Sequence, residues 1–215
     1  MKDQQLEYFS KWEFLPINNE FIVDWLDALS WIAAVQEKYH KKDMDTILNE
    51  LHDAIVWQYL WFKLVNTDKH WLDCKYDENT DIFLESKVAT FSKWMWATFN
   101  DTTFEKAEAF KDKKLRLALS IWSSASTLMF ICYGQHEWIW NFLEKWVQKH
   151  KDWLVVRSTQ SISLSELLFW YNFNILTISK SKEELLTLLT TLSPKTYWKL
   201  TKDQIKDLND FWWIV

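Results

Sequence analysis

The sequence has 215 residues but only one glycine, two prolines and two cysteines. Cys74 and Cys132 lack C-x-x-C spacing and have few histidines around them, which argues against a disulfide scaffold or a structural zinc site. Basic charge is also not in surplus, because 25 Lys and Arg face 30 Asp and Glu. The net charge of −5 therefore excludes a generally basic protein, and a nucleic-acid partner would have to bind a local patch.

The sequence also lacks a long uninterrupted hydrophobic run. Serine and threonine interrupt the longest apolar stretch, residues 117–133, which predicts paired core strands rather than a membrane span. The first residues lack the basic and apolar regions of a signal peptide. We expect a soluble protein, and the low cysteine content favours a reducing, cytoplasmic location.

Glycine and tryptophan depart furthest from ordinary usage. A usage of about 7% predicts about 15 glycines in a chain of this length, yet Gly134 stands alone beside 17 tryptophans. Several tryptophans lie where turns are expected, and Trp153 follows a helix-like run at the place of a C′ glycine. One hypothesis is that many are glycine codons, UGA, read as tryptophan. The alternative is a Trp-rich protein that uses indoles as core and interface anchors.

Hydrophobic periodicity predicts an alternating α/β order. Apolar spacing predicts helices over 24–39 and 44–64, so residues 1–66 are expected to be mainly helical. Short apolar runs predict strands at 72–76, 82–90, 115–121 and 128–133, with a helix opened by a capping pattern at Thr102 to Glu105. Further helices are expected at 137–150, after Ser163 or Ser165, and at 183–192, with strands at 154–157 and 173–178. We expect one domain, 1–215, whose catalytic core is 67–215.

Two carboxylates and a lysine are predicted to converge on neighbouring strands. Glu85 and Lys87 are two residues apart in the predicted strand 82–90 and so share a face, while Asp73 lies on the strand before it. Carboxylate oxygens are ligands that Mg²⁺ prefers, and the ion can polarise a phosphodiester and acidify water. A lysine can orient that water and offset charge in the transition state. A third acid commonly comes from an upstream helix, and Glu50 is the candidate.

This pattern resembles the active site of the PD-(D/E)XK nucleases, in particular the type II restriction endonucleases. That family has the order helix, strand with Asp, strand with Glu-x-Lys, helix, strand, which residues 44–133 follow. The resemblance implies a restriction-endonuclease-like mixed β-sheet flanked by helices and Mg²⁺-dependent cleavage of double-stranded DNA at a short sequence. It also implies Asp73 and Glu85 as metal ligands and Lys87 beside the attacking water. Leu72 stands where the family often has proline.

The bare acid-x-lysine pattern has low specificity, because it occurs three times. Asp112 begins one copy in a lysine-rich helix end, which is typical of a solvated face. A second copy begins at Asp73 itself but has no comparable strand acid upstream. For Glu85 and Lys87, the structural alternative to a nuclease site is a salt bridge on an exposed sheet face.

Candidate DNA-binding residues lie in two segments. Residues 88–103 are predicted to form a long polar loop beside the site, in which Lys93 could contact phosphate while Asn100 and Thr102 could reach base edges. Capping the following helix is the favoured role for Thr102. Gln135 and His136 follow Gly134 at the start of another helix and could contact DNA or simply form a turn and cap.

The leading hypothesis is a sequence-specific DNA endonuclease of restriction type that acts as a homodimer, so that two sites cut two strands. A structure-specific repair or mobile-element nuclease would use the same chemistry. A non-enzymatic, Trp-rich interaction or immunity-type protein belongs to a different class, and the acidic net charge favours it slightly.

Overall fold

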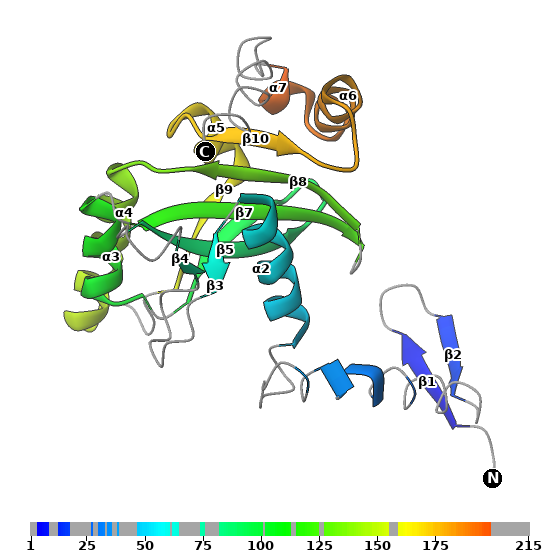
Figure 1. Ribbon diagram of the computed structural model, residues 1–215. Coiled ribbons are helices and arrows are strands. Elements are labelled where there is room, and N and C mark those ends of the chain that lie inside the picture. The colour runs from blue at the N-terminus through cyan, green and yellow to red at the C-terminus, as the bar shows by residue number, and fades with distance from the viewer. Residues whose placement is uncertain are drawn as a thin grey trace. The chain divides into compact units, whose positions relative to one another are not determined.

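The computed structural model in Figure 1 describes residues 4–8, 13–17, 47–60, 62–64, 74–75, 82–100, 102–112, 115–124, 127–154 and 159–198, with scattered positions between 27 and 38. The chain divides into two compact units, residues 1–50 and 51–215. The boundary falls inside helix α2 (Ile47–Leu60). The expectation of a single domain therefore stays a prediction.

The N-terminal unit contains a β-hairpin in which β1 (Gln4–Tyr8) pairs antiparallel with β2 (Glu13–Ile17). This corrects the expectation of a mainly helical N-terminal part for these residues. Each strand is five residues long, too short for its alternation to stand out in the sequence. Helical conformation is present at the described positions between 27 and 38, as the periodicity predicts.

A mixed six-stranded sheet forms the centre of the second unit, in the order β10-β8-β7-β5-β4-β3. Its strands, in chain order, are β3 (Lys63–Leu64), β4 (Cys74–Lys75), β5 (Phe83–Thr90), β7 (Leu115–Ser124), β8 (Thr127–Gly134) and β10 (Asn174–Thr177). β5 and β7 are parallel, and every other pair in this sheet is antiparallel. The predicted α/β class with a mixed sheet flanked by helices is therefore confirmed.

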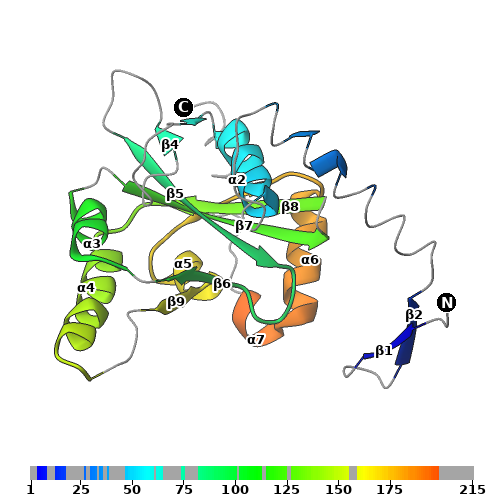
Figure 2. The same cartoon turned by 90° about the horizontal axis from the view of Figure 1, so that it is seen from below.

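Helices cover both faces of this sheet (Figure 2). On one face α2 packs Val56, Trp57 and Leu60 against Leu84 and other sheet residues. The opposite face packs against α3 (Phe104–Lys111), α4 (Trp138–Lys151), α5 (Leu164–Phe169), α6 (Lys182–Leu192) and α7 (Pro194–Tyr197). Successive residues of β5 therefore point into two different cores.

A second, two-stranded sheet joins β6 (Trp96–Phe99) to β9 (Gln160–Ser163). It corrects the prediction of a long polar loop at 88–103, because Met95, Ala97 and Phe99 are buried. Exposed Trp94 and Trp96 alternate with buried Met95 and Ala97, so the sequence shows a continuous apolar run in place of a period-two pattern. β9 was likewise not predicted, and the strand expected at 154–157 lies mostly outside the described residues.

The helix starts follow capping chemistry. Thr103, rather than Thr102, is the N-cap of α3, and its hydroxyl accepts a hydrogen bond from the Lys106 amide. Capping boxes open α5 at Ser163 and α6 at Ser181, each closed by a glutamate three residues later. Among the described residues, no helix has the length and apolar character needed to cross a bilayer.

Trp153 occupies a backbone conformation that favours glycine. Its φ is 57°, in the left-handed region, and its side chain is 93% exposed. The Trp153 amide donates to the His150 carbonyl and the Leu154 amide to the Lys149 carbonyl, the paired bonds of a Schellman motif that ends α4. The predicted C′ position is therefore confirmed, and its geometry supports the glycine-codon hypothesis at this residue.

Other tryptophans are packed as true core residues. Trp122 is 3% exposed, donates its indole N–H to Ser120 Oγ at 2.9 Å and stacks on His52 with centroids 3.9 Å apart. Trp57 is also buried, inside α2. These two positions fit the alternative of genuine indole anchors.

Position 134 requires glycine, because a Cβ there would lie 2.7 Å from the Phe173 ring.

Candidate functional site

Glu85 and Lys87 lie side by side on β5, as their spacing predicts. The Lys87 ammonium donates to Glu85 Oε1, and both side chains point to the sheet face opposite α2. Glu85 is 1% exposed, so the alternative of a salt bridge on an exposed sheet face does not fit. Buried carboxylates are uncommon unless they are paired or bind a cation.

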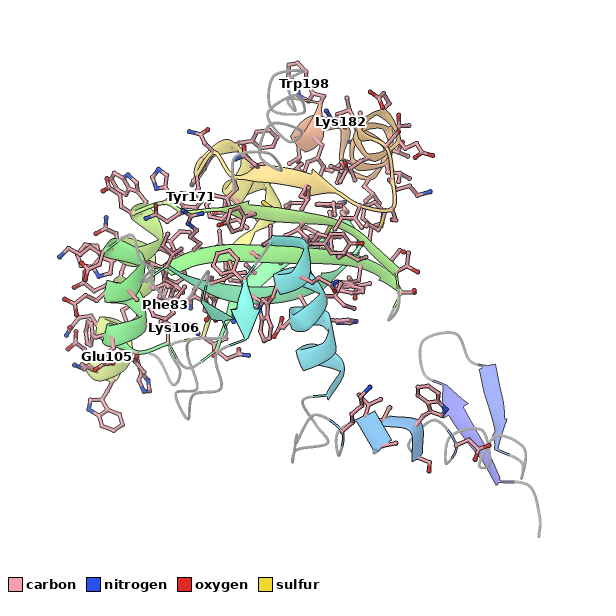
Figure 3. All side chains as sticks on the ribbon, in the orientation of Figure 1. Phe83, Glu105, Lys106, Tyr171, Lys182 and Trp198 are labelled. Atoms are coloured by element: carbon pink, nitrogen blue, oxygen red, sulfur yellow. The ribbon has the colours of Figure 1, made fainter. Side chains whose placement is uncertain are left out.

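A second ammonium reaches the same carboxylate from α3. Lys106 Nζ lies 2.5 Å from Glu85 Oε1, and its side chain is 13% exposed. Figure 3 shows where Lys106 and its exposed neighbour Glu105 lie on α3. The parallel pairing of β5 with β7 requires a crossover, and α3 is the helix of that crossover, so chain topology brings Lys106 over β5.

The second carboxylate oxygen of Glu85, Oε2, has a different environment. Among the described residues, Glu85 Oε2 is buried without a hydrogen-bond partner. An orphaned buried acceptor is destabilising by about 1–3 kcal/mol. The Lys87 ammonium also lies 5.6 Å from the centre of the Phe99 ring, contributed by β6. Within the part of the chain that the structure describes, the site thus has one carboxylate oxygen bound by two lysines and another that is buried without a hydrogen-bond partner.

Helix α2 contributes an acid that the sequence analysis missed. Burial raises the pKa of Asp53, and the nearby Glu85 charge raises it further, while the Ser86 hydroxyl, Lys87 and His52 lower it in part. Asp53 lies one turn after Glu50 on the same helix. The side chain of Glu50 lies outside the described residues, so the structure offers Asp53 as the helix acid beside β5.

Asp73 lies outside the described residues, as do the side chains of β4. Its neighbour Cys74 pairs with Leu84, and Lys75 pairs with Phe83, in antiparallel register. The short β4 strand predicted around 72–76 therefore exists next to the strand with Glu85 and Lys87. No group of three His, Cys, Asp or Glu able to hold a metal occurs within the described residues.

The donor chemistry around Glu85 fits a divalent cation only in part. The unpaired Oε2 is a hard oxygen of the kind that Mg²⁺ prefers, but Asp53 lies beside Ser86 on the α2 side of β5, the face opposite Glu85. Two ammoniums on Oε1 oppose a cation by repulsion. A complete magnesium site would therefore need an additional anionic ligand, and Asp73 and a DNA phosphate are the candidates.

The candidate DNA-binding residues lie in three connections between elements, namely β5–β6, β6–α3 and β8–α4. Lys93 and Asn100 are exposed at the two ends of the β6 segment, whereas Thr102 is 4% exposed and has little surface with which to reach a base. His136 Nδ1 accepts a hydrogen bond from the amide of Trp138, the first residue of α4, at 3.1 Å, whereas the N-cap residue of that helix is Glu137. Gln135 beside it is half-buried.

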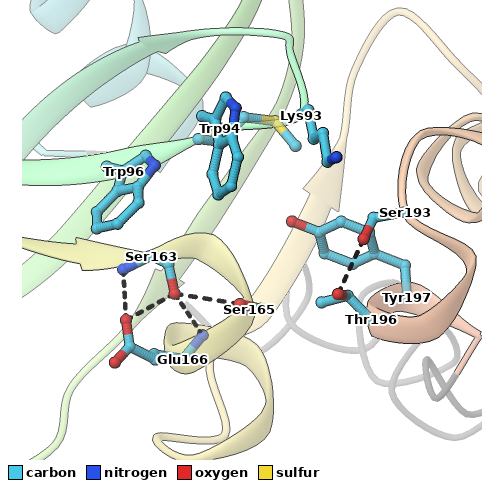
Figure 4. A pocket seen from close by; sticks show the side chains of 10 residues that line it. Lys93, Trp94, Trp96, Ser163, Ser165, Glu166, Ser193, Thr196 and Tyr197 are labelled. Atoms are coloured by element: carbon cyan, nitrogen blue, oxygen red, sulfur yellow. Dashed lines mark hydrogen bonds between the residues drawn. The ribbon is translucent and has the colours of Figure 1, made fainter.

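Lys93 lines a pocket of about 420 Å³, shown in Figure 4. Trp94 and Trp96 form one wall, with ring centroids 6.4 Å apart, and α5 and α7 form the others. Ser163 and Glu166 there are occupied by the capping box of α5. Glu85, Lys87 and Lys106 do not line this pocket.

Sequence reasoning therefore found Glu85 and Lys87 but missed Lys106 and Asp53. One signal existed for Lys106, since it follows the cap by three residues and places a cation in the first turn, where the helix dipole disfavours it. No comparable signal marked Asp53 among the acids of α2.

The chain matches no family model, and neither curated proteins nor solved structures provide a significant match.

Proposed function

We propose that the protein is a Mg²⁺-dependent endonuclease that hydrolyses phosphodiester bonds of double-stranded DNA. The observation that carries the proposal is the buried carboxylate of Glu85, which is bound by Lys87 and has its second oxygen unpaired. Structural salt bridges usually leave no carboxylate oxygen buried and unbonded. A site that receives a cation and a phosphate accounts for that oxygen.

The order of elements supports the same proposal. Helix α2, strand β4, strand β5 with Glu85 and Lys87, helix α3 and strand β7 occur in this chain order, with the short strands β3 and β6 between them. The order resembles that of the PD-(D/E)XK nucleases. The proposal requires the β4–β5 register to continue one residue beyond the Cys74–Leu84 pair, which would bring Asp73 opposite Glu85. It also requires a homodimer for cleavage of both strands.

In this mechanism Glu85 and Asp73 would hold Mg²⁺. When bound there, the ion would polarise the phosphodiester and acidify a water. Lys87 is held by Glu85 and rests against Phe99, so its ammonium is fixed in position. From there it orients the attacking water and offsets the negative charge that grows on the phosphorus oxygens.

The test is cleavage of plasmid DNA by the purified full chain with Mg²⁺. Glu85→Gln, Asp73→Asn and Lys87→Met are each expected to lower the cleavage rate by at least about a hundredfold, because electrostatic groups of this kind commonly contribute that much. Lys111→Met is the matched control, since Lys111 is an exposed lysine of α3 whose ammonium rests over the Trp140 ring. Lys87→Met with wild-type cleavage would contradict this site, and an inactive wild-type chain would favour the interaction-protein alternative.

A further inference from the structure

Two adjoining pockets beside α5 form a groove that the proposed catalytic site does not use. The pocket of about 420 Å³ in Figure 4 adjoins a second one of about 270 Å³, and Ser165, Glu166 and Thr196 line both. The larger volume lies within the range of about 300–1,000 Å³ that is usual for small-ligand sites. We refer to the two pockets together as the α5 groove.

Exposed indoles line both parts of the α5 groove. Trp94 is 68% exposed and Trp96 is 40% exposed, and both rings face the pocket in Figure 4. Trp170, which is 71% exposed, lines the second pocket. An exposed indole face is a platform on which an unpaired nucleic-acid base can stack.

The backbone at Trp94 and Trp96 does not require glycine. Among the described residues other than glycine, positive φ occurs only at Trp153 and Asn172. Trp96 is an ordinary strand residue that pairs with Ser163 in the β6–β9 ladder. The left-handed geometry that favours glycine at position 153 is therefore absent from the indole wall of the groove.

The charge of the groove favours an anionic ligand. Exposed Lys93 lines the first pocket and exposed Lys195 the second. Among the described lining residues the only carboxylate is Glu166, which already accepts hydrogen bonds from the amide and hydroxyl of Ser163. Lys93 Nζ lies 5.6 Å from the centre of the Trp94 ring, so the phosphate of a base stacked on that indole would lie close to a cation.

Tyr197 contributes a hydrogen-bonding group from the opposite wall. Its side chain is buried, and its hydroxyl points into the pocket in Figure 4. Burial raises the pKa of Tyr197 to about 12, so the hydroxyl keeps its proton at neutral pH. A phenol hydroxyl can donate and accept, which matches the polar edge of a base whose face is stacked.

We propose that the α5 groove binds single-stranded DNA. One base stacks on the indoles of Trp94 and Trp96, its phosphate contacts Lys93, and the next nucleotide reaches Trp170 and Lys195. Duplex DNA is a poorer ligand, because its bases stack on one another and their faces are covered. The proposal does not depend on nuclease activity, since the groove and the proposed catalytic site share no residue.

The test measures the fluorescence anisotropy of a labelled single-stranded DNA of about ten nucleotides, a length within the usual range of single-strand sites. The purified full chain is titrated in the presence of EDTA, which prevents Mg²⁺-dependent cleavage. Wild type should bind this strand at least about tenfold more tightly than the duplex of the same sequence or deoxythymidine monophosphate, because several unpaired nucleotides contact the groove. Equal affinity for the strand and for either competitor would overturn the proposal.

Variants of the indole wall should lower the affinity for the strand. Trp94→Ala and Trp96→Ala are each expected to weaken binding about tenfold, the usual effect of losing one stacked base. Trp94→Phe keeps an aromatic face and should retain most of the affinity. Lys93→Met should weaken binding and reduce the slope of log affinity against log salt by about 0.7, because one phosphate contact is lost.

Trp138→Ala is the matched control, since Trp138 is a 59% exposed indole of α4 that lines neither pocket. It should bind the strand as wild type does. An equal loss in this variant would overturn the proposal, as would wild-type affinity in the double variant Trp94→Gly, Trp96→Gly. Circular dichroism should show an unchanged fold in all of them, because the replaced side chains are exposed.

Discussion

Two adjacent residues of β5, Glu85 and Ser86, face two different environments. On the α3 side the carboxylate of Glu85 is bound by two lysines. On the α2 side Ser86 lies beside Asp53, whose strongest influence is burial and whose pKa is therefore raised. One strand thus separates a carboxylate bound by two lysines from a carboxylate whose charged form is disfavoured by burial.

The difference shows that one strand can have an ion-paired carboxylate on one side and a buried carboxylate on the other. A carboxylate with a raised pKa, as at Asp53, is typical of functional sites, although structural networks also produce one. The α2 side is closed by packing, with His52 stacked on Trp122. The α3 side is held by the ion pairs of Glu85 with Lys87 and Lys106.

The largest effect is expected from opening the closed side. Trp122→Ala should lower the free energy of unfolding by about 3–5 kcal/mol, because a buried indole is lost together with its contact to His52 and its bond to Ser120. Urea denaturation followed by circular dichroism would measure it. A loss below about 1 kcal/mol would mean that the indole is not an integral part of this core and would extend the glycine-codon hypothesis to position 122.

Breaking the ion pairs on the other side should cost less than opening the core. Glu85→Ala is expected to lower the free energy of unfolding by about 3 kcal/mol, because it leaves two ammoniums without their partner. The double variant Glu85→Ala, Lys106→Met should recover part of that loss in the same urea assay. Simple additivity of the two single variants would show that Lys106 does not depend on Glu85.

Neutralising Asp53 should raise stability at pH 7, whereas removing the Glu85 carboxylate should lower it. Its folded pKa is raised above the usual 3.8, so stability is lost as the pH rises from that value through the folded pKa and stays lower at pH 7. Asp53→Asn removes the charge at every pH. It should therefore raise the thermal midpoint at pH 7 and flatten the decline above the usual value, as calorimetry at several pH values would show. A lower midpoint at pH 7 would mean that the Ser86 and Lys87 interactions outweigh burial.

The smallest effect concerns an exposed tryptophan, for contrast with Trp122. Trp153→Gly should raise the free energy of unfolding by about 1 kcal/mol, because glycine adopts the left-handed backbone of this C′ position without strain. Trp138→Gly is the control, since Trp138 is also exposed but begins α4 with ordinary helical geometry, where glycine should destabilise. Equal responses at 153 and 138 would refute the geometric argument.

Part of the candidate site could be predicted from spacing alone. The two-residue separation of Glu85 and Lys87 put them on one face, because side chains alternate along a strand. The apolar run that holds them predicted the strand, and the capping pattern predicted the start of α3 to within one residue. The αL position of Trp153 followed from the order of a helix-like and a strand-like run.

Other features depended on contacts between distant segments. β6 and β9 are four residues each and exist by pairing with one another, so neither could be recognised on its own. Asp53 is one of several acids near the start of α2, and only the docking of that helix selects it. Lys106 reads in the sequence as a surface lysine until the crossover helix brings it to Glu85.

The sequence by itself determined the class of fold, the strand with its acid and lysine on one face, and the helix ends, because these depend on periodicity and capping within a few residues. The tertiary structure decided that Glu85 is buried, that it has two ammonium partners and that an α2 acid lies beside the same strand. Burial and charge balance depend on which elements pack together, and no local pattern encodes that choice.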